Sequence, residues 1–297
     1  MSPMNRMSIQ QPLTYLFVPG NRPERFAKAL ASGADRVILD LEDAVAFADK
    51  ANAREAIAGW VASLAANDVE RLLVRINDAA SPWHGDDVLW LQPSSINHIM
   101  LSKCESPEQV AQVLAHMPPG SSVLPLIETV RGVLAANAIA QARQVDRLAF
   151  GSLDYLLDLD LPGPGFALDA AALTIAMASR AAELPPPVAG VTPELDAGQV
   201  QHDLAHARAL GFGAKMCIHP TQVAVVREAF TPDAQTLAWA QRVVTQWQQS
   251  NGVGAIQVDG KMVDKPVLLR AERILALSNK SIYLSHRQGK PHGLHHH

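Results

Sequence analysis

Short apolar runs alternate with longer amphipathic stretches along most of the chain. The runs are rich in β-branched residues and lack polar alternation, which is typical of strands buried on both faces of a parallel sheet. There are eight of them, at 14–19, 36–41, 71–76, 98–103, 123–127, 147–151, 187–191 and 215–219. The pattern therefore predicts eight buried strands.

The stretches between the runs repeat their apolar positions at helical spacing. They predict helices over 23–32, 50–64, 107–116, 129–142, 168–183, 197–210 and 222–230, and a weaker one over 86–91. Repeated strand-then-helix units give a parallel sheet, and eight strands are the number that closes such a sheet into a barrel. We therefore predict a (β/α)8 TIM barrel over residues 12–232.

The segment after the first run bears on the alternative, which is an open, doubly wound sheet. A dinucleotide-binding sheet of that kind carries Gly-x-Gly-x-x-Gly after its first strand. This chain has Pro19-Gly20-Asn21-Arg22-Pro23 there instead. The difference favours the barrel and argues against a dinucleotide cofactor.

The pattern changes after residue 232. A helix is predicted over 235–250, a hairpin over 255–265 with its turn at Asp259-Gly260, and a final helix over 267–278. The barrel has no place for a ninth unit, so we expect residues 233–280 to cover the barrel or to dock on a neighbouring subunit. Residues 281–297 are expected to be a tail that ends in a remnant of a purification tag, whose histidines are excluded as metal ligands.

Composition narrows the class of protein. Hydrophobic residues make up 48% of the 297 residues and charged residues 18%, with a net charge of -4. Such a balance provides a large core and argues against a nucleic-acid partner. Residues 1–11 have no apolar signal region, and no run is long enough to cross a membrane, so a cytoplasmic protein is expected. Cys104 and Cys217 lie in apolar runs and are expected to be buried free thiols.

Acidic residues follow several of the predicted strands. Glu42 and Asp43 follow the second, Glu128 the fifth and Asp154 the sixth. The carboxyl ends of barrel strands meet at one mouth, where clustered carboxylates repel unless they share a proton or a cation. Oxygen ligands without His or Cys spacing suit Mg²⁺ or Mn²⁺. The alternative, that these acids are helix N-caps or first-turn acids, applies most to Asp43 and least to Glu128 and Asp154.

Basic residues stand at the same mouth. Arg75 and Lys103 end the third and fourth runs, where they can bind a substrate carboxylate or an oxyanion, or form salt bridges to Glu42 or Asp43. Arg22 and Arg25 follow the first run and are candidates for phosphate contacts, although an exposed helical turn would explain them equally well.

Seven short segments match, in order, those of one known family. They are Leu16-Phe17-Val18-Pro19-Gly20, Asp40-Leu41-Glu42-Asp43-Ala44-Val45, Val74-Arg75-Ile76-Asn77, Ile127-Glu128-Thr129, Gly151-Ser152-Leu153-Asp154-Tyr155, Ile218-His219-Pro220 and Gly260-Lys261-Met262-Val263-Asp264-Lys265-Pro266. In these segments the chain resembles the citrate lyase β-subunit-like coenzyme A-ester lyases of the HpcH/HpaI aldolase/citrate lyase superfamily, whose relatives include malyl-CoA and citramalyl-CoA lyases. The resemblance spans about residues 13 to 276.

The resemblance implies a Mg²⁺-dependent barrel that forms a trimer or a dimer of trimers. It implies that Glu128 and Asp154 bind the metal and that Arg75 binds the reacting oxyanion. It makes Asp264 an acid–base residue that a neighbouring subunit delivers. Glu42, Asp43 and Lys103 then support the metal and the substrate, and Arg22, Arg25 and Lys28 are weaker candidates for the coenzyme A phosphates.

The implied reaction cleaves a 3-hydroxyacyl-CoA of the citramalyl-CoA or malyl-CoA type to acetyl-CoA and a 2-oxoacid. The alternatives are a thioesterase for the same substrates, an aldolase for free pyruvate, a citryl-ACP lyase-like subunit of a larger complex, and an inactive binding protein. Three departures bear on the substrate: Leu13-Thr14 replaces a common Arg-Ser pair, Ser152-Leu153 replaces Ala-Glu, and Ser102 replaces Pro.

Overall fold

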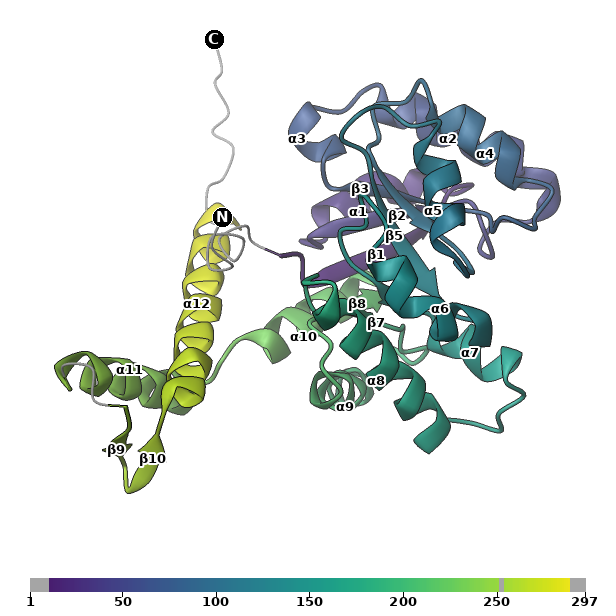
Figure 1. The fold of residues 1–297 in the computed structure, drawn as a ribbon. Coiled ribbons are helices and arrows are strands. Elements are labelled where there is room, and N and C mark those ends of the chain that lie inside the picture. Colours follow the sequence, from purple (N-terminus) through teal and green to yellow (C-terminus); the bar gives the residue numbers. More distant parts are fainter. Residues whose placement is uncertain (1–10, 251–253, 289–297) are drawn as a thin grey trace, which may run out of the picture. The chain divides into compact units, whose positions relative to one another are not determined.

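The computed structural model describes residues 11–250 and 254–288 (Figure 1). Eight parallel strands pair in chain order and close into a barrel, because β1 pairs with both β2 and β8. The strands are β1 (Thr14–Pro19), β2 (Arg36–Asp40), β3 (Leu72–Ile76), β4 (His98–Leu101), β5 (Ser122–Ile127), β6 (Ala149–Phe150), β7 (Val188–Ala189) and β8 (Ala214–Cys217). The prediction of a TIM barrel is confirmed.

Side chains of alternate strand positions fill the barrel interior. This inner cluster consists of Tyr15, Ile38, Leu73, Met100, Leu124, Leu126, Ala149, Val188, Ala214 and Met216. The intervening strand residues, such as Val37 and Ile99, are also fully buried, and side chains at such positions point outward toward the surrounding helices. Burial on both faces explains why the strands show no polar alternation in the sequence.

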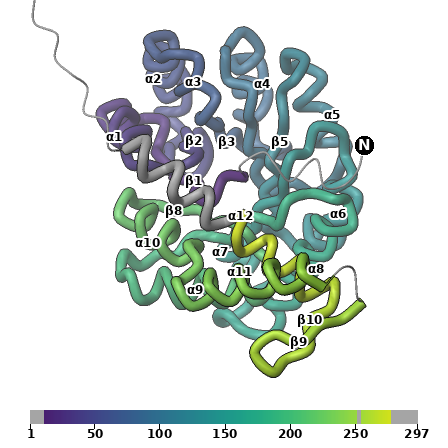
Figure 2. Tube along the Cα trace, turned by 90° about the vertical axis from the view of Figure 1, so that its left-hand side faces the viewer, coloured from purple at the N-terminus to yellow at the C-terminus, as the bar shows by residue number. Residues whose placement is uncertain are grey.

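Helices surround the strands, as Figure 2 shows. They are α1 (Phe26–Ala31), α2 (Lys50–Val61), α3 (Ala66–Val69), α4 (His84–Leu91), α5 (Pro107–Leu114), α6 (Val130–Ala140), α7 (Ser152–Asp158), α8 (Phe166–Ala181), α9 (Ala197–Ala209) and α10 (Pro220–Phe230). All the predicted helices are present. The two short helices α3 and α7 were not predicted, and α7 matters because it carries Asp154.

The chain divides into two compact units, one of residues 11–227 and one that begins at Glu228. The second unit contains α11 (Ala234–Gln249), the hairpin of β9 (Ile256–Val258) and β10 (Lys261–Val263), and α12 (Lys265–Gln288). Asp259 and Gly260 both have positive φ at the predicted hairpin turn. The second unit has a core of its own, which consists of Ala240, Val243, Val258, Val263 and Ala271.

Two further expectations concern the cysteines and the membrane. Cys104 and Cys217 are buried, and burial raises the pKa of each thiol to about 12, so both are unreactive at neutral pH. Among residues 11–250 and 254–288, none of the helices combines the length and the apolar character that a membrane crossing requires.

Candidate active site

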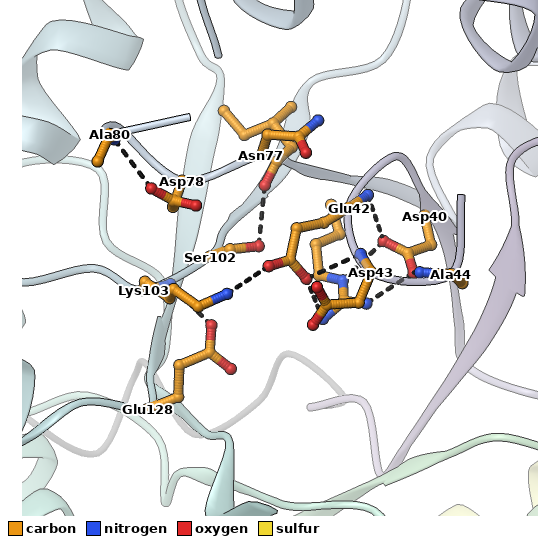
Figure 3. Close-up of polar contacts among 12 residues, drawn as sticks. Asp40, Glu42, Asp43, Ala44, Asn77, Asp78, Ala80, Ser102, Lys103 and Glu128 are labelled. Carbon is orange, nitrogen blue, oxygen red and sulfur yellow. Dashed lines mark hydrogen bonds and ion pairs between the residues drawn. The ribbon is translucent and has the colours of Figure 1, made fainter. Parts of the chain in front are cut away.

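Charged side chains from the ends of neighbouring strands meet at the mouth of the barrel (Figure 3). Arg75 lies in β3, directly beside Asp40 of β2 in the strand register. Its Nε donates to Oδ1 of Asp40 at 2.7 Å and its Nη2 to Oδ2 at 2.6 Å. Burial alone would raise the pKa of Asp40, but the positive charge and hydrogen bonds of Arg75 hold it below its ordinary value.

Glu42 joins two cations at this mouth. Its Oε2 lies 2.9 Å from Nη1 of Arg75, and its Oε1 lies 2.6 Å from Nζ of Lys103. Arg75 thus donates two hydrogen bonds to Asp40 and forms an ion pair with Glu42 through Nη1. The guanidinium also lies over the ring of Phe17, 4.8 Å from its centroid, which keeps it above the barrel core.

Lys103 connects this ion-pair group to Glu128. Its backbone has φ of 44°, a left-handed conformation that costs energy for a residue with a side chain. In this conformation the amide of Lys103 donates to Oε1 of Glu128 at 2.8 Å while its ammonium reaches Glu42. One residue at the end of β4 thus orients two of the acidic groups.

Glu128 and Asp154 are two acidic groups whose negative charges interact at this site. Glu128 is 1% exposed, and Asp154, in the first turn of α7, is half-buried. Burial and then the negative charge of Asp154 raise the pKa of Glu128 to about 8. A Cβ atom on Gly151 would lie 2.6 Å from that of Glu128, so only glycine permits this approach.

These residues fit a divalent cation. Asp40 and Glu42 form ion pairs with Arg75 and Lys103, and the carboxyl groups of Glu128 and Asp154 remain as oxygen ligands for one cation. In the described part of the chain no three His, Cys, Asp or Glu side chains form a metal cluster. A cation here would rest on the two carboxylates of Glu128 and Asp154 and take water and substrate oxygens as its other ligands, as Mg²⁺ commonly does.

Asp43 has a smaller role than Glu42. Its side chain is exposed, and it caps neither of the helices that follow, which begin at Phe47 and Lys50. Its charge is close enough to raise the pKa of Glu42 further, after the larger effect of burial. The proposal that it merely caps a helix is therefore wrong.

Two important residues of the mouth were not predicted, Asp40 and Lys50. Lys50 is 2% exposed, and its ammonium donates to the carbonyl oxygens of Leu41 and Glu42 at 2.7 and 2.8 Å and to Oδ1 of Asn77 at 2.8 Å. These three bonds hold the backbone that presents Glu42. A lysine in the polar start of a predicted helix gives no such signal, whereas an acid that ends an apolar strand, as Asp40 does, could have been noticed.

A cavity of about 400 Å³ lies beside the first strand, between the β1–α1 and β8–α10 connections. Arg25, Lys28 and His219 line it together with Phe17 and Val18. His219 also bonds to Thr221 at 2.8 Å, in agreement with a role in anchoring its loop. The predicted phosphate-binding cations are thus brought to one cavity, except for Arg22.

Arg22 is engaged elsewhere, with an exposed acid. Its Nε lies 2.6 Å from Oε1 of Glu24, which also lies 3.8 Å from Nε of Arg25. An anionic ligand would compete with Glu24 for both arginines. Such exposed pairs contribute little to stability, so they exchange easily.

Asp264 belongs to the second unit and precedes α12. Its Oδ1 accepts a hydrogen bond from the amide of Val267 at 3.2 Å, which makes it the N-cap of this helix. The side chain is half-buried. Its place in catalysis remains a prediction.

The sequence profile of one family, described as HpcH/HpaI aldolase/citrate lyase, matches residues 13–220. The chain belongs to this family. A citrate lyase subunit beta-like protein of Mycobacterium tuberculosis is 37% identical over 268 residues, which cover 88% of this chain and 93% of that protein. The family is one of carbon–carbon lyases, and this chain is an enzyme of its citrate lyase β-like group of coenzyme A-ester lyases.

Other relatives have more specific names. A (3S)-malyl-CoA thioesterase of Cereibacter sphaeroides is 29% identical over 88% of this chain and 92% of its own, and the mitochondrial citramalyl-CoA lyase of Homo sapiens is 27% identical over 89% and 84%. The crystal structure of CitE from Mycobacterium tuberculosis in complex with magnesium, acetoacetate and coenzyme A superposes with a TM-score of 0.80, at 34% identity over 90% of this chain and 98% of that one.

Proposed function

We propose that this enzyme cleaves a 3-hydroxyacyl-CoA of the malyl-CoA or citramalyl-CoA type to acetyl-CoA and a 2-oxoacid, with Mg²⁺ on Glu128 and Asp154. The observation that carries the proposal is that the buried Glu128 and the half-buried Asp154 interact through their charges beside Arg75. Glu128 and Asp154 offer oxygen ligands to a divalent cation, which would take the place of the proton on Glu128, and their neighbour Arg75 is a guanidinium that can stabilise an oxyanion. Magnesium in the CitE crystal structure supports the choice of metal.

The roles of the residues follow from where negative charge forms on the substrate as the carbon–carbon bond breaks. When bound, Mg²⁺ supplies Lewis acidity to the oxygen that becomes the new carbonyl. The substrate hydroxyl gives its proton to the carboxylate of Asp264 as its C–O bond becomes a carbonyl, and the electron pair of the Cα–Cβ bond passes to the acetyl part as an enolate. Arg75, held in place by Asp40 and Glu42, stabilises this enolate. Asp264 gives a proton to its carbon, and in the reverse direction it removes one from acetyl-CoA.

Coenzyme A is assigned to the cavity beside β1. Arg25, Lys28 and His219 offer positive or hydrogen-bonding groups for phosphates, and Phe17 and Val18 offer an apolar surface that leads toward Arg75. Arg22 joins them once Glu24 releases it. The thioester would thereby enter the mouth beside β1, across the barrel from Glu128, which follows β5, and Asp154, which lies in α7.

We also propose that the enzyme is a homotrimer or a hexamer in which Asp264 serves a neighbouring barrel. Large apolar side chains are exposed on three consecutive helices, among them Leu134 (82%) on α6, Leu157 (81%) on α7 and Phe166 (88%) on α8. Such a surface is typical of proteins that self-associate. Sedimentation equilibrium of the full chain tests this, and a monomer at micromolar concentration would contradict it.

A thioesterase is the second candidate, which the similarity to a (3S)-malyl-CoA thioesterase favours. One experiment distinguishes the lyase activity from the thioesterase activity. The protein is incubated with malyl-CoA and with citramalyl-CoA in the presence of Mg²⁺, and the products are identified by mass spectrometry. Acetyl-CoA with glyoxylate or pyruvate supports the lyase, whereas free coenzyme A with the intact hydroxy acid shows a thioesterase.

A further inference from the structure

The helix α7 is attached to the β5–α6 segment at two points, one on each side of the two acidic residues. Before Asp154, the amide of Gly151 donates to the carbonyl oxygen of Ile127 at 2.9 Å. After it, Oδ2 of Asp158 accepts a hydrogen bond from the amide of Val130 at 2.7 Å. Glu128 therefore lies between Ile127 and Val130, and Asp154 lies between Gly151 and Asp158.

We infer that Asp158 is a positioning residue for the metal site, which rests on the proposed function of Glu128 and Asp154. Asp154 and Asp158 are four residues apart and so share one face of α7. The bond from Val130 fixes the far end of this seven-residue helix, and the direction of its axis decides how closely Asp154 approaches Glu128. Without the bond, what holds the helix to the β5–α6 segment within residues 11–250 and 254–288 is the Gly151 bond and side-chain packing.

The location of Asp158 supports this role over a purely local one. An acid at the last position of α7 interacts unfavourably with the negative end of that helix. At the start of α6, where Val130 is the first residue, the same charge is favourable. However, α6 already has an N-cap, because Thr129 accepts a hydrogen bond from Gly132 at 3.0 Å. The bond from Val130 to Asp158 is therefore not needed as a cap of α6. It connects the start of α6 to the end of α7.

The test measures the affinity for Mn²⁺, used as a paramagnetic probe of the site, by electron paramagnetic resonance on the full chain without substrate. Asp158→Ala should weaken binding about five- to tenfold, the loss expected for one charge-assisted hydrogen bond. Asp158→Asn keeps an acceptor oxygen and should weaken it about twofold or less. The control is Asp196→Ala, which removes a similar bond to an amide (2.9 Å, from Gln199) at the start of α9, in another βα unit of the barrel.

A second variant removes the same bond from the donor side. Val130→Pro deletes the amide hydrogen at the first position of α6, where proline is well tolerated, and the preceding Thr129 has the extended conformation (φ −130°, ψ 158°) that proline requires. It should weaken Mn²⁺ binding about as much as Asp158→Ala. The double variant should bind Mn²⁺ no more weakly than either single variant, because both substitutions remove the same hydrogen bond.

The outcomes separate the inference from the proposal on which it rests. If the wild type binds Mn²⁺ and both Asp158→Ala and Val130→Pro bind it equally well, the inference is wrong and the metal site stands. An equal loss in Asp196→Ala would also overturn it, since a general loss of stability would then explain the effect. If the wild type and Glu128→Gln both fail to bind Mn²⁺, the metal site itself is wrong and the inference falls with it.

Discussion

Asp40 and Arg75 are neighbours in the β2–β3 register, and the carboxylate of one accepts two hydrogen bonds from the guanidinium of the other, at 2.7 and 2.6 Å. Both side chains are largely buried. This pairing fixes the orientation of Arg75 before any ligand arrives, so little reorganisation is needed when an oxyanion forms beside it. The remaining N–H groups of Arg75 are thereby placed at the mouth.

We predict that Asp40→Asn lowers kcat about ten- to a hundredfold and changes KM for the acyl-CoA much less. The amide keeps one acceptor but loses the charge that orients Arg75, and hydrogen bonds to charged groups contribute about 1.5–3 kcal/mol. Steady-state kinetics measure both constants. Asp169→Asn, which alters a surface contact with His206, is the matched control and should behave like the wild type. An unchanged kcat in Asp40→Asn would show that Arg75 needs no such support.

The raised pKa of Glu128 predicts that metal binding releases a proton. Burial and Asp154 raise this pKa from 4.5 to about 8, so the carboxyl is protonated at neutral pH without metal. The apparent Mg²⁺ affinity should rise about tenfold per pH unit up to about 8 and then level off. Calorimetry in buffers of different ionisation enthalpy should detect about one proton released at pH 7. Binding that is independent of pH would contradict the assignment.

The same shift predicts how stability depends on pH in the absence of divalent metal. The folded protein keeps a proton on Glu128 that the unfolded chain loses above pH 4.5, so this contribution is fully present below that pH and is lost as the pH rises through about 8. Chemical denaturation in EDTA should therefore show stability falling over this range. Glu128→Gln, which carries no titrating group there, should lack this part of the fall.

The cavity beside β1 predicts two opposite effects on coenzyme A binding. Arg25→Gln with Lys28→Gln should raise KM for the acyl-CoA about three- to tenfold with little change in kcat, because these cations would bind the phosphates of coenzyme A and not the acyl group. Glu24→Gln should lower KM, since it removes the acid that competes for Arg22 and Arg25. Both effects should shrink at high salt. Equal KM values in all variants would place coenzyme A elsewhere.

Asp264→Asn should abolish turnover but preserve folding, because asparagine also serves as an N-cap for α12. Asp264→Ala should lose the activity and about 1 kcal/mol of stability as well. If Asp264 serves a neighbouring barrel, mixed oligomers of Asp264→Asn and Glu128→Gln subunits regain part of the activity. The absence of recovery in verified mixed oligomers would contradict the exchange between subunits.

The sequence indicated the barrel well because its strands are buried on both faces, which leaves continuous apolar runs whose order fixes the topology. It also indicated Glu128, Arg75 and Lys103, since charges that end such runs must lie at the mouth. It missed α7, whose seven residues are too few to show a helical period, and it missed Lys50. Two of the three partners of Lys50 are backbone carbonyls, which no sequence pattern displays.

The central claim is that Glu128 and Asp154 hold a divalent cation on which carbon–carbon cleavage depends. The most direct test follows acetyl-CoA formation from malyl-CoA and citramalyl-CoA by mass spectrometry, first after treatment with EDTA and then during titration with Mg²⁺. The wild type should be inactive in EDTA and recover with Mg²⁺, and Glu128→Gln should remain inactive at all metal concentrations. Full acetyl-CoA formation in EDTA, or recovery of Glu128→Gln with Mg²⁺, would contradict the claim.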